Sequence, residues 1–475
     1  MKGITKRKDD YSKWYNDIIS QADMAEHSPV KGCMVIKPYG YAIWENIRNI
    51  LDKMFKETGH ENLYFPLFIP ESFIRKEADH VEGFAPHLAV VTHGGGKKLE
   101  ENIIVIPTSE AIICSTYAKW VKSYRDLPLL YNQWANVVRW EMRTRLFLRT
   151  TEFLWQEGHT VHGSCEEAEE ETLKMLEVYR SCAEDYMAIS VIKGLKSESE
   201  KFAGALRTYS IEAMMQDKKA LQSGTSHNLG QNFAKVFNIQ YQNKQGHLEY
   251  AWQTSWGVST RLIGALIMSH SDDMGLVLPP KMAPIHIVII PIYKTLEELS
   301  DIMEVCRKIK EDIGIKYIVK IDDRDTEKPG AKFFEWEKKG VPIRVEVGPK
   351  DLKAKEAVLV RRDLNTKSRV SLETLTVSIE ELLMDIQKTL LEKHRKFREE
   401  NTFSIDNYGD FKNLYEGEEG FALCSWCGNP ECEAKIQEET KATIRALPMD
   451  GREEAGVCIY CGKTSKVKAI FAKAY

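Results

Sequence analysis

The sequence predicts a multidomain protein that combines α/β and α+β units. At 475 residues the chain is too long for one compact core and has the length of about three domains. From residue 285 onward, short apolar runs alternate with helical stretches, which is typical of an α/β domain. Five of the ten cysteines lie in residues 424–475, which indicates a small metal-binding domain there.

The first predicted domain covers residues 1–282 and mixes amphipathic helices with strand-like runs. A helix is expected over residues 41–55, where large apolar residues recur near helical spacing. Residues 102–107 (NIIVIP) predict a strand. Thr108 or Ser109 is then expected to cap the helix that follows.

The second predicted domain covers residues 283–395, and its elements predict a compact α/β fold with a largely parallel sheet. Its expected strands are 285–290, 317–321, 343–347 and 357–361, and its expected helices are 296–313 and a stretch near Phe333. Residues 328–369 hold 12 Lys or Arg against 6 Asp or Glu. That basic stretch is either a solvated face or a face that contacts RNA.

The third predicted domain covers residues 396–475, after a charged helix over 379–400. Its cysteines follow the pattern Cys427-x4-Cys432, then 25 residues, then Cys458-x2-Cys461. Four thiolates form a closed tetrahedral site, which predicts a structural zinc ion rather than a catalytic one. Cys424 is a fifth cysteine that competes for the four positions, and free thiols without metal are the alternative.

Composition excludes several classes of protein. The 66 Lys and Arg against 70 Asp and Glu give a net charge of −4, so a globally basic nucleic-acid coat is excluded. No apolar run approaches the length of a membrane span, so no membrane association is expected. Residues 1–8 are basic but lack a signal-peptide core, and we expect a cytoplasmic protein.

Arg139 and Glu141 form the first candidate site in the first domain. They lie two residues apart on a predicted strand and are therefore expected to point to the same face. Arginine can hold a phosphate through two hydrogen bonds, and a neighbouring carboxylate can bind a ligand amine or a metal. An ordinary cross-strand ion pair on a hairpin is the structural alternative.

Two further stretches have the character of ligand-binding segments. In residues 256–261, Gly257 permits close approach of a ligand to the backbone, and Arg261 adds positive charge near a helix start. In residues 221–232, Gln222, Thr225 and His227 predict the rim of a small-ligand site. A plain glycine turn and a polar loop are the respective alternatives.

Taken together, these segments resemble a class II aminoacyl-tRNA synthetase, specifically a prolyl-tRNA synthetase of the archaeal and eukaryotic type. Residues 61–70 (ENLYFPLFIP) resemble motif 1 of that class, residues 139–153 resemble motif 2, and residues 257–261 resemble motif 3. The similarity extends from about residue 11 to Tyr475. It implies an antiparallel-sheet catalytic core, an α/β anticodon-binding domain and a small zinc-containing α+β domain at the C-terminal end.

The resemblance implies ATP-dependent activation of L-proline to prolyl-adenylate, with Mg²⁺ bound to the ATP, and transfer to the 3′ end of tRNA(Pro). Only 62 residues separate His159 from Gln222, which are too few for the large editing domain of bacterial-type relatives. We therefore expect no such insertion. A small apolar slot discriminates poorly against small side chains, so mischarging with alanine or cysteine is expected.

The resemblance also implies roles for individual residues. Arg139, Arg261 and Glu141 are the expected catalytic residues. The residues expected to bind proline are Thr108, Glu110, Arg139, Trp155, Glu157, His159, Phe202, His227, Ser255 and Gly257. Those expected to bind ATP are Arg139, Glu141, Thr150, Thr151, Phe153, Gln222, Thr225, Ser259 and Arg261.

Outside the catalytic core, the resemblance implies tRNA contacts, a zinc site and a homodimer. Glu337, Arg344 and Lys350 are expected to read the anticodon. The zinc ligands are expected to be Cys427, Cys432, Cys458 and Cys461, with Cys424 left over. A homodimer is expected through motif 1, and the carboxylate of the terminal Tyr475 is expected to reach toward the active site.

Two other readings are compatible with a synthetase-like chain. One is a different class II enzyme, such as a threonyl enzyme, but we find no Cys and His arrangement for its catalytic zinc in the first domain. The other is a synthetase-like regulator that binds tRNA without charging it. Such relatives usually lose the residues that hold ATP, whereas Arg139, Glu141 and Arg261 are all present.

Overall fold

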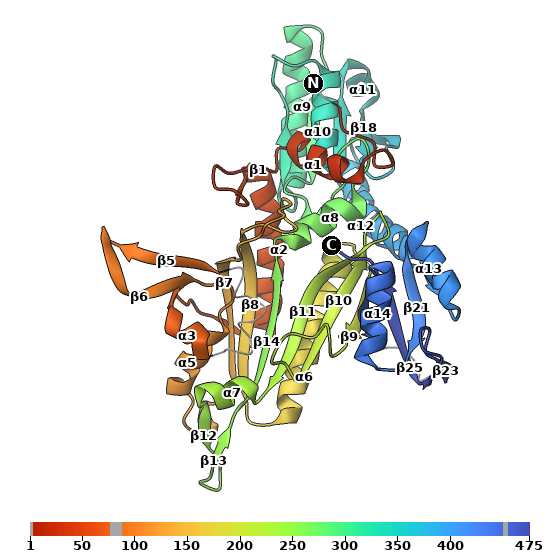
Figure 1. Ribbon diagram of the computed structural model, residues 1–475. Coiled ribbons are helices and arrows are strands. Elements are labelled where there is room, and N and C mark those ends of the chain that lie inside the picture. Colours follow the sequence, from red (N-terminus) through yellow and green to blue (C-terminus); the bar gives the residue numbers. More distant parts are fainter. Residues whose placement is uncertain (1–2, 77–87, 450–454) are drawn as a thin grey trace.

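The computed structural model describes residues 3–76, 88–449 and 455–475 (Figure 1). Residues 1 and 2 of the basic N-terminal stretch lie outside this part of the chain. A large sheet with its helices forms the body of the molecule, an α/β unit stands above it, and the C-terminal unit lies beside the sheet (Figure 1). Within the described ranges, no helix combines the length and the apolar character needed to cross a bilayer.

One large sheet runs through both the body and the C-terminal unit. In order across the sheet, its strands are β20 (Thr402–Ser404), β21 (Phe421–Trp426), β25 (Val467–Ala472), β22 (Thr443–Pro448), β9 (Val191–Leu195), β10 (Arg207–Met214), β11 (Ala220–Gly230), β14 (Trp252–Ser259), β8 (Glu152–His162), β7 (Leu129–Val138) and β3 (Glu61–Asn62). Neighbours are antiparallel except for β20–β21 and β3–β7. An antiparallel catalytic sheet was expected and is confirmed.

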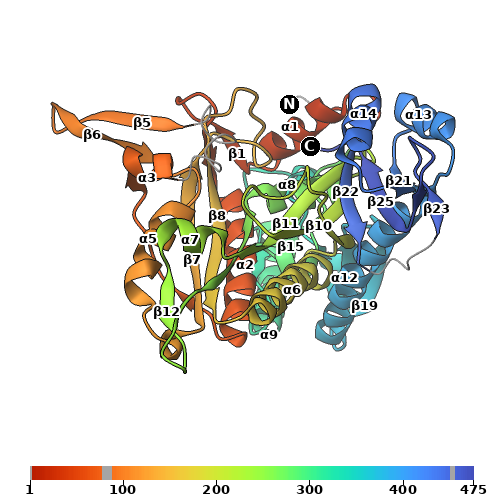
Figure 2. The same cartoon turned by 60° about the horizontal axis from the view of Figure 1, so that its bottom comes forward.

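Alternation along the central strands gives the sheet one apolar and one polar face. In β10, Tyr209, Ile211 and Ala213 enter the main core, so the intervening Thr208 and Ser210 turn to the opposite face. The helices that share this core are α1 (Tyr11–Gln21), α2 (Pro38–Glu57), α6 (Cys165–Ser181) and α8 (Arg261–His270). Figure 2 shows α6 running across the strands beside α2. The polar face is therefore left for a ligand.

The local sequence explains where these helices begin. The helix α2 has Pro38 at its first position, where the missing N–H costs no hydrogen bond. Its residues Ile43, Ile47, Leu51 and Phe55 are all buried, which confirms the helix expected over residues 41–55. The Ser164 hydroxyl accepts a hydrogen bond from the Glu167 N–H and caps α6, which ends in a π-helical turn over Cys182–Tyr186.

Smaller elements surround the body. A three-stranded sheet, drawn in orange in Figure 1, projects beside β7 and contains the strand expected over residues 102–107. Its strands are β4 (Phe68–Pro70), β5 (Ala89–Gly94) and β6 (Lys97–Val105). The other small elements are β1 (Ala25–His27), β2 (Met34–Ile36), α3 (Glu71–Lys76), α5 (Glu110–Trp120), α7 (Asn232–Phe237), β12 (Gln240–Gln242), β13 (Leu248–Tyr250), and short helical turns at Tyr124–Asp126 and Pro280–Met282.

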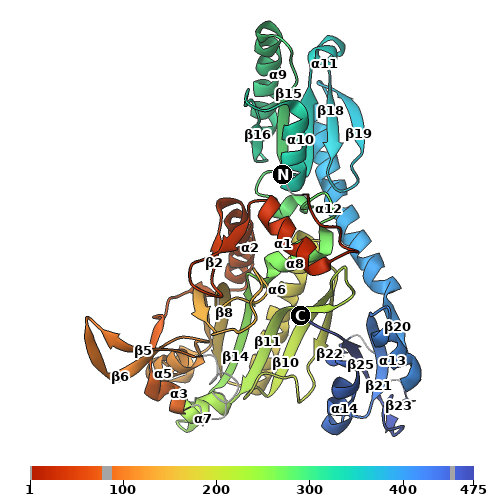
Figure 3. The same ribbon diagram turned by 45° about the horizontal axis from the view of Figure 1, so that its top comes forward.

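The second unit is an α/β fold with a five-stranded sheet (Figure 3). In order across the sheet, its strands are β16 (Val319–Ile321), β15 (Ile287–Pro291), β17 (Ile343–Val347), β18 (Glu356–Arg361) and β19 (Lys367–Ser371), and its helices are α9 (Leu296–Gly314), α10 (Pro329–Lys338) and α11 (Pro349–Ala354). The expectation of a largely parallel sheet is only half right. β15 pairs in parallel with both neighbours, but β17–β18 and β18–β19 are antiparallel, because the connections there are shorter than a parallel crossover needs.

The long helix α12 (Leu375–Glu400) leads to the C-terminal unit, whose other elements are α13 (Tyr408–Glu416), α14 (Pro430–Thr440), β23 (Gly456–Val457) and β24 (Thr464–Ser465). This unit joins the body at the pairing of β22 with β9. A Cβ atom at Gly194 would lie 2.7 Å from the carbonyl oxygen of Leu447, so only glycine allows the two strands to come this close. The two units therefore share one continuous sheet.

Candidate active site

A cavity of about 290 Å³ opens on the polar face of the central strands. Side chains of β8, β10, β11 and β14 line it, together with the segment before α5 and the first residue of α8. Its lining residues are Thr108, Glu110, Arg139, Phe153, Trp155, Glu157, His159, Glu200, Phe202, Thr208, Gln222, Ser223, Gly224, Thr225, His227, Ser255, Trp256, Gly257, Val258, Ser259 and Arg261. All residues predicted for proline and ATP are among them except Glu141, Thr150 and Thr151.

Arg139 lies directly after β7, which ends at Val138. The expectation that Arg139 and Glu141 share one face of a strand is therefore wrong, because the strand ends before both residues. The Arg139 backbone N–H donates to the Thr151 carbonyl oxygen at 2.8 Å, and its Nε donates to the Pro107 carbonyl oxygen at 2.9 Å. Its guanidinium carbon lies 5.5 Å from the ring centre of Trp155. Burial lowers the pKa of Arg139, but the group remains a cation.

A buried acidic cluster occupies one end of the cavity. The Ser109 hydroxyl donates to Oε1 of Glu157, and the Gln133 amide donates to the same oxygen at 2.5 Å. The other oxygen, Oε2, lies 2.9 Å from Nε2 of His159. Although burial opposes it, this hydrogen bond raises the pKa of His159. The three partners fix the position of the Glu157 carboxylate, which is 3% exposed.

A second carboxylate, Glu110, completes this acidic end. It is the first residue of α5, is 4% exposed, and accepts a hydrogen bond from the Thr108 hydroxyl. The expected side-chain cap of α5 is absent among the described contacts of Thr108 and Ser109. Both hydroxyls instead donate to carboxylates of the cavity, so this sequence signal reflects the site rather than helix capping.

His227 lies on β11 at the same end, opposite Thr208 of β10. Its Nδ1 lies 2.9 Å from the Thr208 hydroxyl, and its ring is centred 4.8 Å from that of Phe202. Burial, followed by the neighbouring His159, lowers the pKa of His227 to about 3. His227 is therefore neutral at physiological pH and contributes shape and a hydrogen bond rather than charge.

Arg261 lies at the other end of the cavity, as the first residue of α8. Its backbone N–H donates to the Ser259 hydroxyl at 3.2 Å, and its Nε lies 3.4 Å from the Leu148 carbonyl oxygen. Burial, and then repulsion from Arg139 and Arg149, lowers the pKa of Arg261 to about 10. Two half-buried arginines thus face one cavity, which favours a polyanionic ligand between them.

Three predicted residues lie beside the cavity rather than in its wall. Glu141 is near Arg149, with 3.7 Å between the charged atoms. Thr150 donates its hydroxyl to the Glu152 carbonyl oxygen, and Thr151 is held by backbone hydrogen bonds to Gly32 and Arg139. The structure places all three on the chain segment that connects β7 to β8.

Sequence reasoning missed several residues of the wall, including Glu200, Thr208 and Trp256. Thr208 lies on β10, where strand alternation points it into the site, a signal that becomes readable only once the strand register is known. Alternation turns the Trp256 ring to the opposite face, where it packs against Phe55 and Tyr179 in the main core. The Trp256 ring also fills the space that a side chain at Gly158 would need. Glu200 belongs to an irregular segment and gave no sequence signal.

The sulfur atoms of Cys427, Cys432, Cys458 and Cys461 lie within 4.8 Å of one another, as the spacing predicted. The Cys427 sulfur is 3.7 Å from those of both Cys432 and Cys461. A tetrahedron with metal–sulfur bonds of about 2.3 Å has edges of about 3.8 Å, so the thiols fit a zinc ion. Cys424 is buried within β21 and is not part of this group.

The predicted anticodon residues all lie in the second unit, on three different elements. Glu337 is on α10, Arg344 is on β17, and the exposed Lys350 is in the first turn of α11. Arg344 is 8% exposed, and its guanidinium already contacts Glu346 at 3.0 Å and lies 4.3 Å above the ring centre of Phe333. To bind a base, its guanidinium must present donor groups that Glu346 leaves unused.

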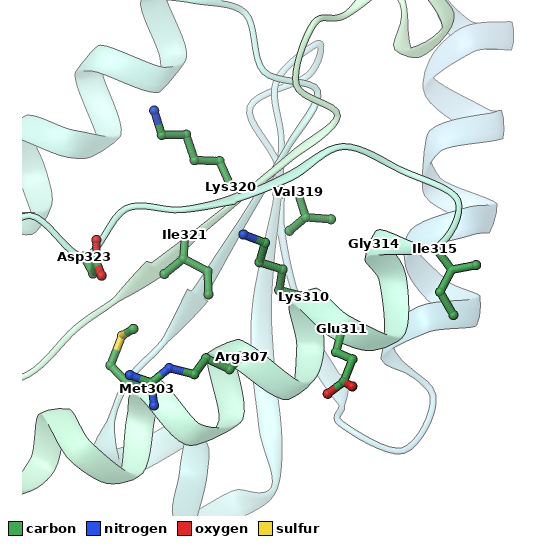
Figure 4. Close-up of a pocket in the computed structure, with 10 residues that line it drawn as sticks. All are labelled: Met303, Arg307, Lys310, Glu311, Gly314, Ile315, Val319, Lys320, Ile321 and Asp323. Atoms are coloured by element: carbon green, nitrogen blue, oxygen red, sulfur yellow. The ribbon is translucent and has the colours of Figure 1, made fainter.

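A larger but shallower hollow of about 840 Å³ lies in the second unit, between α9 and β16 (Figure 4). Arg307 and Lys310 extend from α9, whereas Lys320 extends from the other side of β16 and lies over the Trp336 ring. The charged groups of this hollow do not converge. The smaller cavity of the large sheet is therefore the better candidate for chemistry.

Comparison with known proteins agrees with this arrangement. Residues 92–270 match the model for the tRNA synthetase class II core domain (G, H, P, S and T), residues 286–388 match the anticodon binding domain, and residues 408–475 match the prolyl-tRNA synthetase C-terminal domain. The chain is 58% identical to the proline--tRNA ligase of Prosthecochloris aestuarii, with 99% of each protein covered. It is 56% identical to proline--tRNA ligase 2 of Clostridioides difficile, with 99% of this chain and 98% of the relative covered. It is also 56% identical to the proline--tRNA ligase of Porphyromonas gingivalis strain W83, with 100% of this chain and 99% of the relative covered. With three matching domains and full-length relatives of this identity, the chain belongs to the prolyl-tRNA synthetase family of class II aminoacyl-tRNA synthetases.

Proposed function

We propose that this chain activates L-proline with ATP and transfers the prolyl group to tRNA(Pro). The observation that supports this most strongly is the polarity of the cavity. Two buried carboxylates, Glu110 and Glu157, lie at one end, and the half-buried cation Arg261 lies at the other, with Arg139 beside both. An amino acid with a charged nitrogen suits the acidic end, and a nucleoside triphosphate suits the basic one.

At the acidic end, Thr108, Glu110 and Glu157 would hold the charged ring nitrogen of proline. Trp155, His159, Phe202, His227, Ser255 and Gly257 would surround the ring. Because His227 is neutral, its ring adds no positive charge beside the prolinium nitrogen. The slot admits a small side chain, so alanine and cysteine are the expected errors of activation.

At the basic end, Arg139 would bind the α-phosphate and the proline carboxylate together. Arg261 would lie against the adenine, with Phe153 on the opposite side. Glu141, Thr150, Thr151, Gln222, Thr225 and Ser259 would complete the ATP site. Mg²⁺ bound to ATP supplies charge neutralisation of the phosphates.

The reaction needs no protein nucleophile. The proline carboxylate attacks the α-phosphorus of ATP, and the bond to pyrophosphate breaks in line, which leaves prolyl-adenylate. A terminal ribose hydroxyl of tRNA then attacks the prolyl carbonyl carbon and AMP leaves. The residues of the chain act by positioning the reactants and by stabilising charge that develops on the phosphate oxygens.

The second unit would bind the anticodon stem-loop through the basic stretch 328–369. Glu337, Arg344 and Lys350 are the proposed base-reading residues, since arginine pairs with guanine O6 and N7 and glutamate accepts from the guanine N–H groups. The proposed domain boundaries are 1–282, 283–395 and 396–475. They place the reading residues and the catalytic cavity in different units.

The four-cysteine group would hold a structural zinc ion, since four protein thiolates leave no coordination position for substrate. Two further proposals concern the oligomeric state and the cellular location of the protein. A homodimer would form through motif 1, where Tyr64 and Phe68 are 74% and 48% exposed. The proposed location is the cytoplasm, a reducing compartment that suits a long chain whose cysteines include a four-thiol group.

ATP–pyrophosphate exchange with each amino acid in turn, without tRNA, tests the proposed function. Exchange that strongly prefers proline and is lost in Arg139→Ala would support both the adenylation site and its substrate. Exchange with another amino acid would overturn the specificity. Folded protein that exchanges with no amino acid would favour the alternative of a tRNA-binding regulator.

A further inference from the structure

A buried ion network crosses the boundary between the C-terminal unit and the catalytic sheet. It consists of Lys196, which follows β9, Glu212 on β10 and Arg445 on β22, with exposures of 4%, 1% and 8%. Arg445 is the only one of the three that the C-terminal unit contributes. The network therefore brings a residue from a unit that contains the cysteine group into the sheet that forms the cavity.

The geometry of the network is specific. The Lys196 Nζ donates to Oε1 of Glu212 and to the carbonyl oxygen of Arg445, both at 2.8 Å. The Arg445 guanidinium contacts both oxygens of Glu212, with its Nε and Nη2 atoms at 3.3 Å. Although burial opposes it, Lys196 and Arg445 hold the pKa of Glu212 below its usual range, so the carboxylate stays charged.

The network lies at the basic end of the cavity. Glu212 is paired in register with Gln222, a residue of the cavity wall, so their side chains share the polar face. Arg445 also lies 3.9 Å from the carboxylate of Glu200, another residue of that wall. Glu212 and Arg445 act in opposite directions on the pKa of Arg261, which burial lowers most strongly. The three residues therefore stand directly behind the wall that faces ATP in the proposed function.

Arg445 supplies one of the two positive charges that contact Glu212, and the one that lies near Glu200. Lys196 neutralises Glu212, and Arg445 offsets the remaining carboxylate of Glu200. Without Arg445, a buried or half-buried negative charge would be left uncompensated beside a site for a triphosphate. A like charge at that position opposes binding of an anion more strongly than binding of a zwitterion at the other end of the cavity.

We propose that Arg445 is a positioning residue for ATP, through which the C-terminal unit fixes the Glu212–Gln222 edge of the cavity and neutralises its carboxylates. This inference rests on the proposed function and assigns part of the ATP site to a unit that does not itself line the cavity. Arg445 does not touch the reacting atoms. It acts through Glu212 and Glu200.

The test is steady-state ATP–pyrophosphate exchange with Arg445→Met, Arg445→Lys and a control variant, Arg398→Met, in the full chain. Arg398 on α12 also binds β9, donating to the Val191 carbonyl oxygen at 2.9 Å, but it does not line the cavity. We expect Arg445→Met to raise the KM for ATP roughly tenfold, with the KM for proline changed less than about twofold. Arg445→Lys keeps the charge but loses the two-pronged contact, so its KM for ATP should lie between those of the unaltered protein and Arg445→Met. Arg398→Met should leave both constants unchanged.

A purely structural role predicts a different pattern. It would lower the melting temperature and the fraction of active enzyme, and therefore kcat, without separating the two KM values. The proposal is overturned if Arg445→Met leaves the KM for ATP unchanged, if both KM values rise by the same factor, or if Arg398→Met has the same effect. Should Arg445→Met fail to fold, an unchanged KM for ATP in Arg445→Lys would overturn it equally. Absence of proline-dependent exchange in the unaltered protein would instead refute the proposed function.

Discussion

Replacing Glu157 by glutamine tests the proline end of the cavity most directly. The carboxylate is 3% exposed, and its oxygens are bound by Ser109, Gln133 and His159. Glutamine has the same shape, and its oxygen can still accept from Ser109 and Gln133, so the wall should keep its form. The charge that faces the prolinium nitrogen is lost. A hydrogen bond to a charged group contributes about 1.5–3 kcal/mol, which corresponds to a roughly 10- to 150-fold lower kcat/KM for proline.

The assay is ATP–pyrophosphate exchange with proline and ATP varied separately. We expect the loss to appear with proline as the varied substrate, while the KM for ATP stays within about twofold. Glu171→Gln is a matched control, because Glu171 also binds a buried histidine, His60, at 3.0 Å, but does not line the cavity. An unchanged kcat/KM for proline in Glu157→Gln, or an equal loss in both variants, would refute the reasoning.

The same variant has a pH signature in stability. Because the folded-state pKa of His159 is raised, the pair contributes stability that is complete below pH about 6.5 and is lost as pH rises through the raised pKa. Glu157→Gln should therefore lower the free energy of unfolding more at pH 6 than at pH 8.5. Equal destabilisation at both pH values in urea titrations would contradict a charged His159.

Three further predictions concern other parts of the chain. Cys432→Ser should lower the melting temperature of the protein and reduce bound zinc, measured by metal analysis, from about one ion per chain to near zero. Retained zinc would exclude Cys432 as a ligand. The Tyr475 hydroxyl donates to Asp217 at 2.6 Å. Adding residues after Tyr475 should reduce turnover at least about tenfold. Full turnover of a C-terminally tagged protein would refute a role for this end of the chain. Burial lowers the pKa of His270 to about 4 and that of His394 to about 3. The stability that the two neutral histidines confer is therefore complete above pH about 6.5, and below that pH each histidine should lower the free energy of unfolding by about 1.4 kcal/mol per pH unit. A free energy of unfolding that does not change between pH 6.5 and 5 would contradict this.

Several elements were predictable because their signals are local. The apolar positions of residues 41–55 fall on one face of a helix, and the structure has a helix there that buries those positions. The strand over residues 343–347 is buried along its whole length and has the predicted bounds. The cysteine spacing likewise predicted a four-thiol site in this region, and the family resemblance indicated which four of the five cysteines would meet.

The errors share one physical cause, which is competition between local patterns and the tertiary site. Thr108 and Ser109 have the composition of a helix cap, but their hydroxyls donate to Glu110 and Glu157. Arg139 was placed on a strand, but β7 ends one residue earlier and the arginine is held instead by backbone carbonyl and aromatic contacts. For Thr108 and Ser109, a buried carboxylate offers a stronger partner than the local backbone does.

By itself, the sequence determined the family, the domain order, most of the helices and strands, and the residue types of the site. Only the tertiary structure decided which of these residues meet and in what protonation state. Thr108, Glu157, His227 and Arg261 are far apart in the chain, and the register of the antiparallel strands brings them into one cavity. Burial there shifts the pKa of His227 and Arg261 downward, and the strand pairing of β22 with β9 adds Arg445 behind the wall. Such effects depend on distances and solvent exclusion between distant segments, which no local pattern encodes.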